Sequence, residues 1–176
     1  MTQSDGVLIR EMTEADVAAV SAIRVQGWQW AYAGIVPQPY LDAMDPEEDA
    51  ARRREFLARG AGRVHNLLAE VDGAPVGWAA LGPYRGEPDD SGDGELYALY
   101  VLPAHVGTGV GRALTTAAVR RTAELGRDRL LLWVLADNAR ARRFYDAAGF
   151  APDGAETTDD YDGVPLREVR YVRQVP

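Results

Sequence analysis

Apolar and polar positions alternate along the chain with two different periods, one typical of strands and one typical of helices. Strand-like segments are short and apolar or alternating, namely residues 7–12, 64–71, 75–82, 95–102, 129–135 and 167–172. Segments with apolar side chains at helical spacing are residues 14–25, 46–59, 110–125 and 138–148. Expected N-caps of these helices include Thr13, Asp45 and Asp137, and Gly60, Gly126 and Gly149 follow three of the helices as stop signals.

The order of these segments predicts a mixed sheet. Residues 64–71 and 75–82 flank Asp72-Gly73, a pair that suits a two-residue hairpin turn, so the two segments should pair antiparallel. The helix at 110–125 lies between the strands at 95–102 and 129–135. Because a helix that connects two neighbouring strands of a sheet forms a crossover, these two strands should pair in parallel. We therefore expect an α/β chain whose sheet carries helices on both faces.

Composition restricts the classes of function. The chain of 176 residues is 47% hydrophobic, which suits one globular domain spanning residues 1–176. It contains no cysteine, so thiolate metal sites and cysteine nucleophiles are excluded, and only His65 and His105 remain as imidazole ligands. We therefore expect no metal. No apolar window is long enough for a membrane span and the N-terminus lacks a signal pattern, so we expect a soluble, cytoplasmic protein without a membrane partner.

The net charge of −8 argues against a nucleic-acid partner, because phosphates would be repelled. An acidic surface suits a cationic partner, although acidity can also serve solubility alone.

Three alternating glycines, Gly107, Gly109 and Gly111, stand between the strand at 95–102 and the helix at 110–125. Glycine lets backbone N–H groups approach an anion at a helix N-terminus. The dinucleotide pattern fails because no third glycine has the required spacing, and the nucleotide P-loop fails because Arg112 and Ala113 follow Gly111. The surviving pattern is compatible with an anion cradle or with a flexible turn that starts a helix.

Two segments resemble the GNAT superfamily of N-acyltransferases. Residues 106–114, Val-Gly-Thr-Gly-Val-Gly-Arg-Ala-Leu, are similar to the acyl-CoA loop of that family, with Val106 where the family usually has Gln or Arg. Residues 137–150, Asp-Asn-Ala-Arg-Ala-Arg-Arg-Phe-Tyr-Asp-Ala-Ala-Gly-Phe, resemble the family's helix that contains an Asn and a Phe-Tyr pair. The resemblance implies a GNAT-like fold with a mixed, mostly antiparallel sheet of about six to seven strands, flanked by helices on both faces.

The resemblance also implies acetyl-CoA as co-substrate, with its pyrophosphate on the amides of residues 107–112 and its pantetheine arm along the strand at 99–101. The residues that we expect to bind the cofactor are Leu99, Tyr100, Val101, Val106, Gly107, Thr108, Gly109, Val110, Gly111, Arg112, Asn138 and Tyr145.

Two residues are candidates for catalysis. Glu95 starts the strand that would hold the thioester, at the spacing seen in relatives with a catalytic glutamate, so it is the candidate base; an exposed carboxylate without a role is the alternative. Tyr145 matches the family's tyrosine and is the candidate proton donor to the leaving thiolate. Strand alternation predicts that Glu95 and Tyr97 share one face with Leu99 and Val101.

The acceptor side is indicated only by aromatic residues. Trp28, Tyr32 and Tyr97 are candidates for binding the acceptor, since rings can enclose a cationic amine, but rings also commonly pack in a core. The predicted function is transfer of an acetyl group from acetyl-CoA to a primary amine of a small molecule or peptide. A non-catalytic acyl-CoA-binding module of the same fold is the alternative, and a homodimer is one open option for the oligomeric state.

Overall fold

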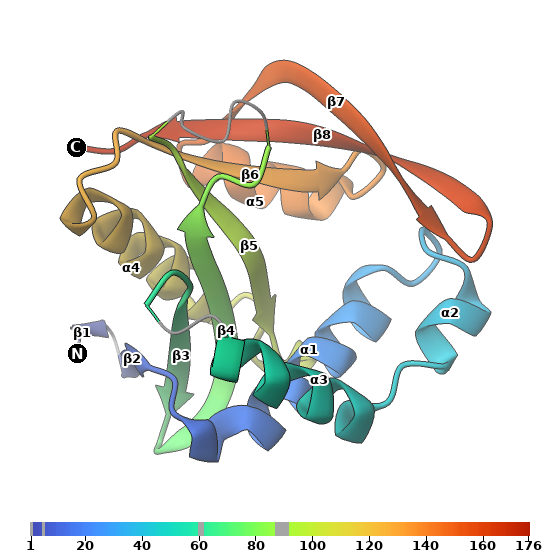
Figure 1. Ribbon diagram of the computed structural model, residues 1–176, viewed down its shortest axis with the longest axis horizontal. Helices are drawn as coiled ribbons and strands as arrows, with labels where there is room; N and C mark the ends of the chain where they lie inside the picture. The colour runs from blue at the N-terminus through green and yellow to red at the C-terminus, as the bar shows by residue number, and fades with distance from the viewer. Residues whose placement is uncertain (1, 5, 60–61, 87–91) are drawn as a thin grey trace.

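The computed structural model describes residues 2–4, 6–59, 62–86 and 92–176. Within this part of the chain, eight strands form one sheet in the order β1-β2-β3-β4-β5-β6-β8-β7 (Figure 1). The strands are β1 (Thr2–Ser4), β2 (Val7–Glu11), β3 (His65–Val71), β4 (Ala74–Pro83), β5 (Gly94–Val101), β6 (Arg129–Leu135), β7 (Ala151–Tyr161) and β8 (Val164–Gln174). The helices are α1 (Val17–Ala31), α2 (Gln38–Asp42), α3 (Pro46–Arg59), α4 (Val110–Glu124) and α5 (Ala139–Ala147).

The predicted pairing of the strands is confirmed. β3 and β4 form an antiparallel hairpin, and Asp72 and Gly73 at its turn have positive φ angles of 50° and 77°. β5 and β6 are joined through α4 and run parallel, whereas the other strand pairs are antiparallel. The sheet is therefore mixed and mostly antiparallel, as expected.

Several details differ from the sequence prediction. The segment before the last strand is itself a strand, β7, which was not predicted because it lies at the sheet edge, exposes most of its side chains and lacks apolar alternation. With β1 it raises the strand number above six or seven. α1 continues to Ala31 instead of ending near Val25. Asn138 and not Asp137 caps α5, and its side-chain oxygen accepts a hydrogen bond from the amide of Ala141. Gly60 lies outside the described residues.

Helices cover both faces of the sheet. On one face, Val110 and Leu114 of α4 are fully buried against β-strand side chains, and Ala141 and Tyr145 of α5 pack against the same core. On the other face, Val20 and Ile23 of α1 are buried in a second core, which contains Trp78. In Figure 1, α4 and α1 accordingly lie on opposite sides of β4 and β5. We refer below to the α4 face and the α1 face of the sheet.

A β-bulge in β5 overturns one prediction. Ala80 of β4 pairs with Ala98, but the next residue, Leu81, pairs with Leu96, so Tyr97 is the extra residue. Leu96, Leu99 and Val101 therefore belong to the α4 face, while Tyr97, Ala98 and Tyr100 pack on the α1 face. Glu95 pairs with Gly82 and falls on the α1 face by alternation. The expectation that Glu95 and Tyr97 share a face with Leu99 and Val101 is wrong, because simple alternation does not hold across the bulge.

β5 and β6 part soon after they begin. Their ladder consists of the pairs Gly94 with Leu130 and Glu95 with Leu131, and it does not continue beyond them. The amide of Leu102 donates to Val76 on the β4 side. Because successive backbone groups point to opposite edges of a strand, the N–H and C=O groups of Leu99 and Val101 face the space between β5 and β6. We call this space the β5/β6 split.

The entry to α1 contains a carboxylate that should make stability depend on pH. Asp16 accepts hydrogen bonds from the amide and hydroxyl of Thr13 and forms an ion pair with Arg10. The hydrogen bond from Arg10 is the main cause that holds the pKa of Asp16 well below its usual range. A carboxyl with a depressed folded-state pKa stabilises the fold above its unfolded pKa of about 3.9 and loses this contribution as pH falls below that value.

We therefore predict that Asp16→Asn lowers the free energy of unfolding at pH 7 by about 1 kcal/mol, the typical effect of losing a cap. The difference from the wild type should shrink in urea titrations as pH drops below about 4. Glu14→Gln, an exposed change in the same turn, is the matched control and should alter stability little at either pH. A pH-independent Asp16→Asn defect would contradict the assignment.

Candidate active site

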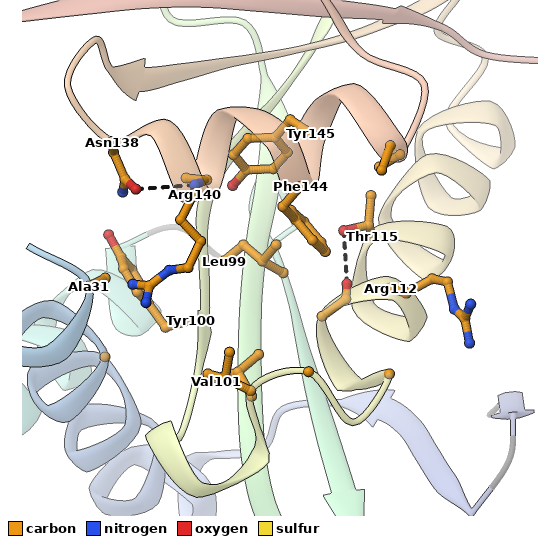
Figure 2. Close-up of a pocket in the computed structure, with 18 of the residues that line it drawn as sticks. Ala31, Leu99, Tyr100, Val101, Arg112, Thr115, Asn138, Arg140, Phe144 and Tyr145 are labelled. Carbon is orange, nitrogen blue, oxygen red and sulfur yellow. Dashed lines mark hydrogen bonds between the residues drawn. The ribbon is translucent and has the colours of Figure 1, made fainter.

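A cavity of about 840 Å³ occupies the β5/β6 split. This volume is within the range of roughly 300–1,000 Å³ that is typical of small-molecule and cofactor sites. The residues around it come from α1, β5, the loop before α4, α4 itself, α5 and β8, and Figure 2 shows most of them. Leu99, Tyr100 and Val101 of β5 form its floor, and Asn138, Phe144 and Tyr145 approach from α5.

The glycine loop forms one end of the cavity, and its geometry explains two of its glycines. Gly109 is the N-cap of α4 and has a φ of 94°, a conformation that residues with a side chain rarely adopt. Gly111 lies inside the helix, where an added Cβ atom would approach the ring of Phe144 to 3.3 Å. The first turn of α4 leaves backbone N–H groups without helical acceptors at the cavity wall, which is the arrangement that binds anions.

α5 supplies a polar cap and an aromatic donor. Asn138 is buried, and its oxygen is used by the cap, so its amide NH₂ group remains available to donate. The ring of Tyr145 packs edge-on against Phe144 and Phe150. Its hydroxyl has no hydrogen-bond partner among the described residues, and burial raises the pKa of Tyr145 well above 10. The phenol is therefore protonated at neutral pH.

Most of the residues expected to bind the cofactor line the cavity. These are Leu99, Tyr100, Val101, Val106, Gly107, Gly109, Gly111, Arg112, Asn138 and Tyr145. Two others do not. Val110 is fully buried in the core beneath the loop, and the hydroxyl of Thr108 donates to the carbonyl of His105. Any contribution of these two residues to an anion site would come through their backbone.

The structure adds cavity residues that sequence reasoning missed. Trp30 of α1 and Arg140 of α5 both line the cavity, and the guanidinium lies 3.5 Å from the centre of the Trp30 ring. This contact joins the two helices across the split. Gly27 of α1 lies so close to β5 that an added Cβ would meet the Cβ of Tyr100 at 3.0 Å. Both contacts join residues that are distant in sequence, so no local motif marks them.

Glu95 lies outside the cavity lining, and among the described residues Arg85 is its hydrogen-bond partner. Its side chain is buried, and its two carboxylate oxygens accept hydrogen bonds from the amide and guanidinium of Arg85 at 2.7–3.3 Å. The guanidinium also stacks 4.0 Å from the ring centre of Tyr97. The hydroxyl of Tyr97 donates to the carbonyl of Pro83. The role of Glu95 as a base stays a prediction.

The remaining aromatic candidates form one cluster on the α1 face, which we call the aromatic cluster. It consists of Trp28, Tyr32, Tyr40, Tyr100 and Tyr161. The hydroxyls of Tyr32 and Tyr100 lie 3.3 Å apart, and burial raises the pKa of both. Tyr100 also lines the cavity, so the aromatic cluster adjoins it. Trp28 and Tyr32 do share a helical face, since α1 extends to this region.

Two further observations concern the described residues as a whole. No group of three or more His, Cys, Asp or Glu side chains among them could hold a metal ion. None of the helices in the described ranges is long and apolar enough to cross a membrane.

Comparison with known proteins places this geometry in a family. The model of the acetyltransferase (GNAT) family matches residues 24–150. The chain belongs to this family. The uncharacterized N-acetyltransferase YuaI of Bacillus subtilis (strain 168) is 29% identical over 164 residues, which cover 93% of this chain and 90% of that protein. The uncharacterized N-acetyltransferase Rv2669 of Mycobacterium tuberculosis (strain ATCC 25618 / H37Rv) is 36% identical over 146 residues, or 83% and 88% of the two chains.

A crystal structure shows the same fold with a ligand bound. The PaiA N-acetyltransferase from Thermoplasma acidophilum, in complex with coenzyme A, superimposes with a TM-score of 0.72 at 20% identity, covering 96% of this chain and 98% of that one. The GNAT-like fold inferred from the glycine loop and the α5 segment is confirmed. This GNAT protein is an acetyltransferase enzyme. The prediction of an enzyme is thus confirmed, and the alternative of a non-catalytic module is not.

The glycine loop yields a testable prediction about the cofactor. Gly109→Glu should abolish the thermal stabilisation by acetyl-CoA, because a carboxylate in the loop would occupy the anion site and repel phosphate. A ligand at 100 times its dissociation constant stabilises a protein by about 2.7 kcal/mol, which calorimetry detects easily.

Gly126→Glu is the matched control, because Gly126 also has a positive φ, 69°, but lies at the other end of α4. This variant should lose stability from backbone strain and keep its response to acetyl-CoA. If Gly109→Glu keeps the same response as the control, the anion site lies elsewhere.

Proposed function

We propose that this enzyme transfers an acetyl group directly from acetyl-CoA to a primary amine of a small molecule or peptide. The observation that carries the proposal is the cavity in the β5/β6 split, which runs from the anion-binding turn of α4 to the Tyr145 phenol. Phosphate, an extended amide-containing arm and a thioester are the successive parts of an acyl-CoA. The cavity offers a matching group for each of them.

The cofactor would be held mainly by backbone. Its pyrophosphate would accept hydrogen bonds from the first amides of α4, near Gly109 and Gly111. Its pantetheine amides would pair with the free edge of β5 at Leu99 and Val101, as an added strand does. Backbone recognition explains why Val106 can replace the usual polar residue of the loop.

Tyr145 is proposed as the proton donor to the departing thiolate. Figure 2 shows its ring on α5, directed toward β5 and the cavity. A thiolate with a conjugate-acid pKa of about 8.5 gains from a nearby O–H donor as its charge develops. Burial keeps the Tyr145 phenol protonated, and no described residue takes its hydrogen bond. The amine can attack the thioester carbonyl without a covalent enzyme intermediate.

Glu95 is proposed as the group that removes the proton of the acceptor ammonium. It lies on the α1 face, as do Tyr97 and the aromatic-cluster residue Tyr100. To reach the amine, its carboxylate must exchange one Arg85 contact for the acceptor. Trp28, Tyr32 and Tyr97 would border the acceptor on this side of the sheet.

The proposed function predicts that acetyl-CoA and a reactive primary amine give free thiol and acetylated amine in equal amounts. Tyr145→Phe keeps the ring and its packing but removes the donor, so acetyl-CoA binding should persist while turnover falls by roughly 10 to 1,000 times. Thiol release followed alongside mass spectrometry of the amine measures both.

Tyr84→Phe is the matched control, because the Tyr84 hydroxyl accepts a hydrogen bond from Arg170, and Tyr84 is not among the residues that line the cavity. The Tyr145→Phe defect should shrink with an acyl donor whose leaving thiol is more acidic. An equal defect with both donors would make Tyr145 only a wall of the cavity, and thiol release without an acetylated amine would contradict transfer to an amine.

For the base, Glu95→Gln should lower turnover about 100-fold near neutral pH and recover partly as pH rises, because the free amine then forms without help. The affinity for acetyl-CoA should hardly change. Arg85→Gln removes the partner of Glu95 but leaves the carboxylate, so its pH profile should stay near that of the wild type.

Equal pH profiles for the two variants would mean that Glu95 only holds Arg85. Wild-type turnover of Glu95→Gln at every pH would place the base elsewhere.

A further inference from the structure

Glu168 of β8 stands on the α1 face of the sheet beside the aromatic cluster. Strand pairing places it in one row with Leu135 of β6 and Thr157 of β7, and paired residues share a face. Leu135 is buried in the same core as Tyr161, a member of the aromatic cluster. Glu168 therefore borders the region that Trp28, Tyr100 and Tyr161 enclose.

Glu168 is a carboxylate without a cation of its own. It is partly buried and makes no hydrogen bond or ion pair to any of the described residues. Burial is the main cause that raises its pKa, and Asp159 of β7 and Glu95 of β5 add to this effect. Arg85 is the cation that opposes this rise, but its guanidinium is already bonded to Glu95.

Trp28 of the aromatic cluster is enclosed together with Tyr100. The Nε1 atom of Trp28 is fully buried, and its interaction with the Tyr100 hydroxyl opposes the rise in the pKa of that phenol. Burial is the main cause of this rise, and the charge of Glu168 contributes to it. The carboxylate of Glu168 therefore acts on groups inside the aromatic cluster.

These groups lie between the cavity and β8. Tyr100 lines the cavity on one side and packs against Trp28 on the other. Glu168 raises the pKa of Tyr100 and of Tyr161, so its charge acts on both rings. An acceptor that reaches a thioester in the cavity from the α1 face would meet Tyr100 first, with Trp28 and Glu168 around it.

We propose that Glu168 binds the positively charged group of the acceptor, and that the enzyme selects cationic amines that carry no free carboxylate. The inference rests on the proposed function and specifies its acceptor. The cations beside this region already have partners: Arg85 pairs with Glu95, and Arg24, which lies over the Trp28 ring, pairs with Asp49, so neither is bonded to Glu168 or Asp159. A cation is attracted both by these carboxylates and by the faces of the rings, whereas a second carboxylate on the acceptor is repelled.

The matched ligands for a test are lysinamide and lysine, which differ only by a neutral amide in place of the carboxylate. Calorimetric titrations, in the absence and presence of coenzyme A, should show at least about tenfold tighter binding of lysinamide to the wild type. Glu168→Gln should weaken lysinamide binding about tenfold and reduce the preference over lysine, with thermal stability maintained because no partner of Glu168 is lost.

Glu156→Gln is the matched control. Glu156 lies on β7 and pairs with Val169, so it belongs to the same hairpin but to the α4 face, and the change in charge is identical. Its removal also breaks an ion pair with Arg167, but this pair is exposed to solvent and contributes little to stability. It should change lysinamide binding by less than about twofold.

Equal affinities of the wild type for lysinamide and lysine, or no measurable lysinamide binding, would overturn the inference. So would a loss in Glu168→Gln no larger than that in Glu156→Gln. Failure of the proposed function is a separate result: lysinamide would bind with the predicted preference, but acetyl-CoA would yield no acetylated amine.

Discussion

The separation of β5 from β6 after Glu95 is the constraint on which the rest of the site depends. β5 and β6 are paired at their first residues and then separate, so the backbone groups of Leu99 and Val101 have no neighbouring strand to pair with. Unpaired backbone polar groups are costly inside a protein unless a ligand or water satisfies them. The cavity at the split is therefore bordered by backbone hydrogen-bonding groups of β5, and the N-terminus of α4 at its end adds N–H groups of the kind that bind anions.

The bulge at Tyr97 divides the functions of β5 between its two faces. Before it, Glu95 is directed to the α1 face; after it, Tyr100 is on that face while Leu99 and Val101 turn to the α4 face. Helices α4 and α5 can thus supply the groups around the cofactor. In the proposed function, the acceptor binds on the α1 face, beside the aromatic cluster and the carboxylates of β7 and β8. One inserted residue therefore lets a single strand direct two different sets of side chains to the two faces of the sheet.

The elements and motifs that depend on local sequence could be predicted. The hairpin at Asp72-Gly73, the glycine loop and the α5 segment each have a short pattern with a local physical cause. The bulge could not be predicted, because alternation in residues 94–101 looks regular until pairing with β4 is known. β7 could not be predicted because an edge strand that pairs with one neighbour needs no apolar face, so its sequence lacks the alternation typical of strands. The contact of Arg140 with Trp30 and the placement of Glu168 beside the aromatic cluster join distant parts of the chain, and the pairing of Arg85 with Glu95 has no local motif.

Amide hydrogen exchange, measured residue by residue with and without acetyl-CoA, tests most directly whether the split holds the cofactor. Binding should slow exchange at Leu99 and Val101, whose amides face the split, and in the first turn of α4, while Leu102, which already donates to Val76, should change little. If acetyl-CoA binds but leaves exchange at Leu99, Val101 and the α4 N-terminus unchanged, the cofactor lies elsewhere and the role assigned to the β5/β6 split is wrong.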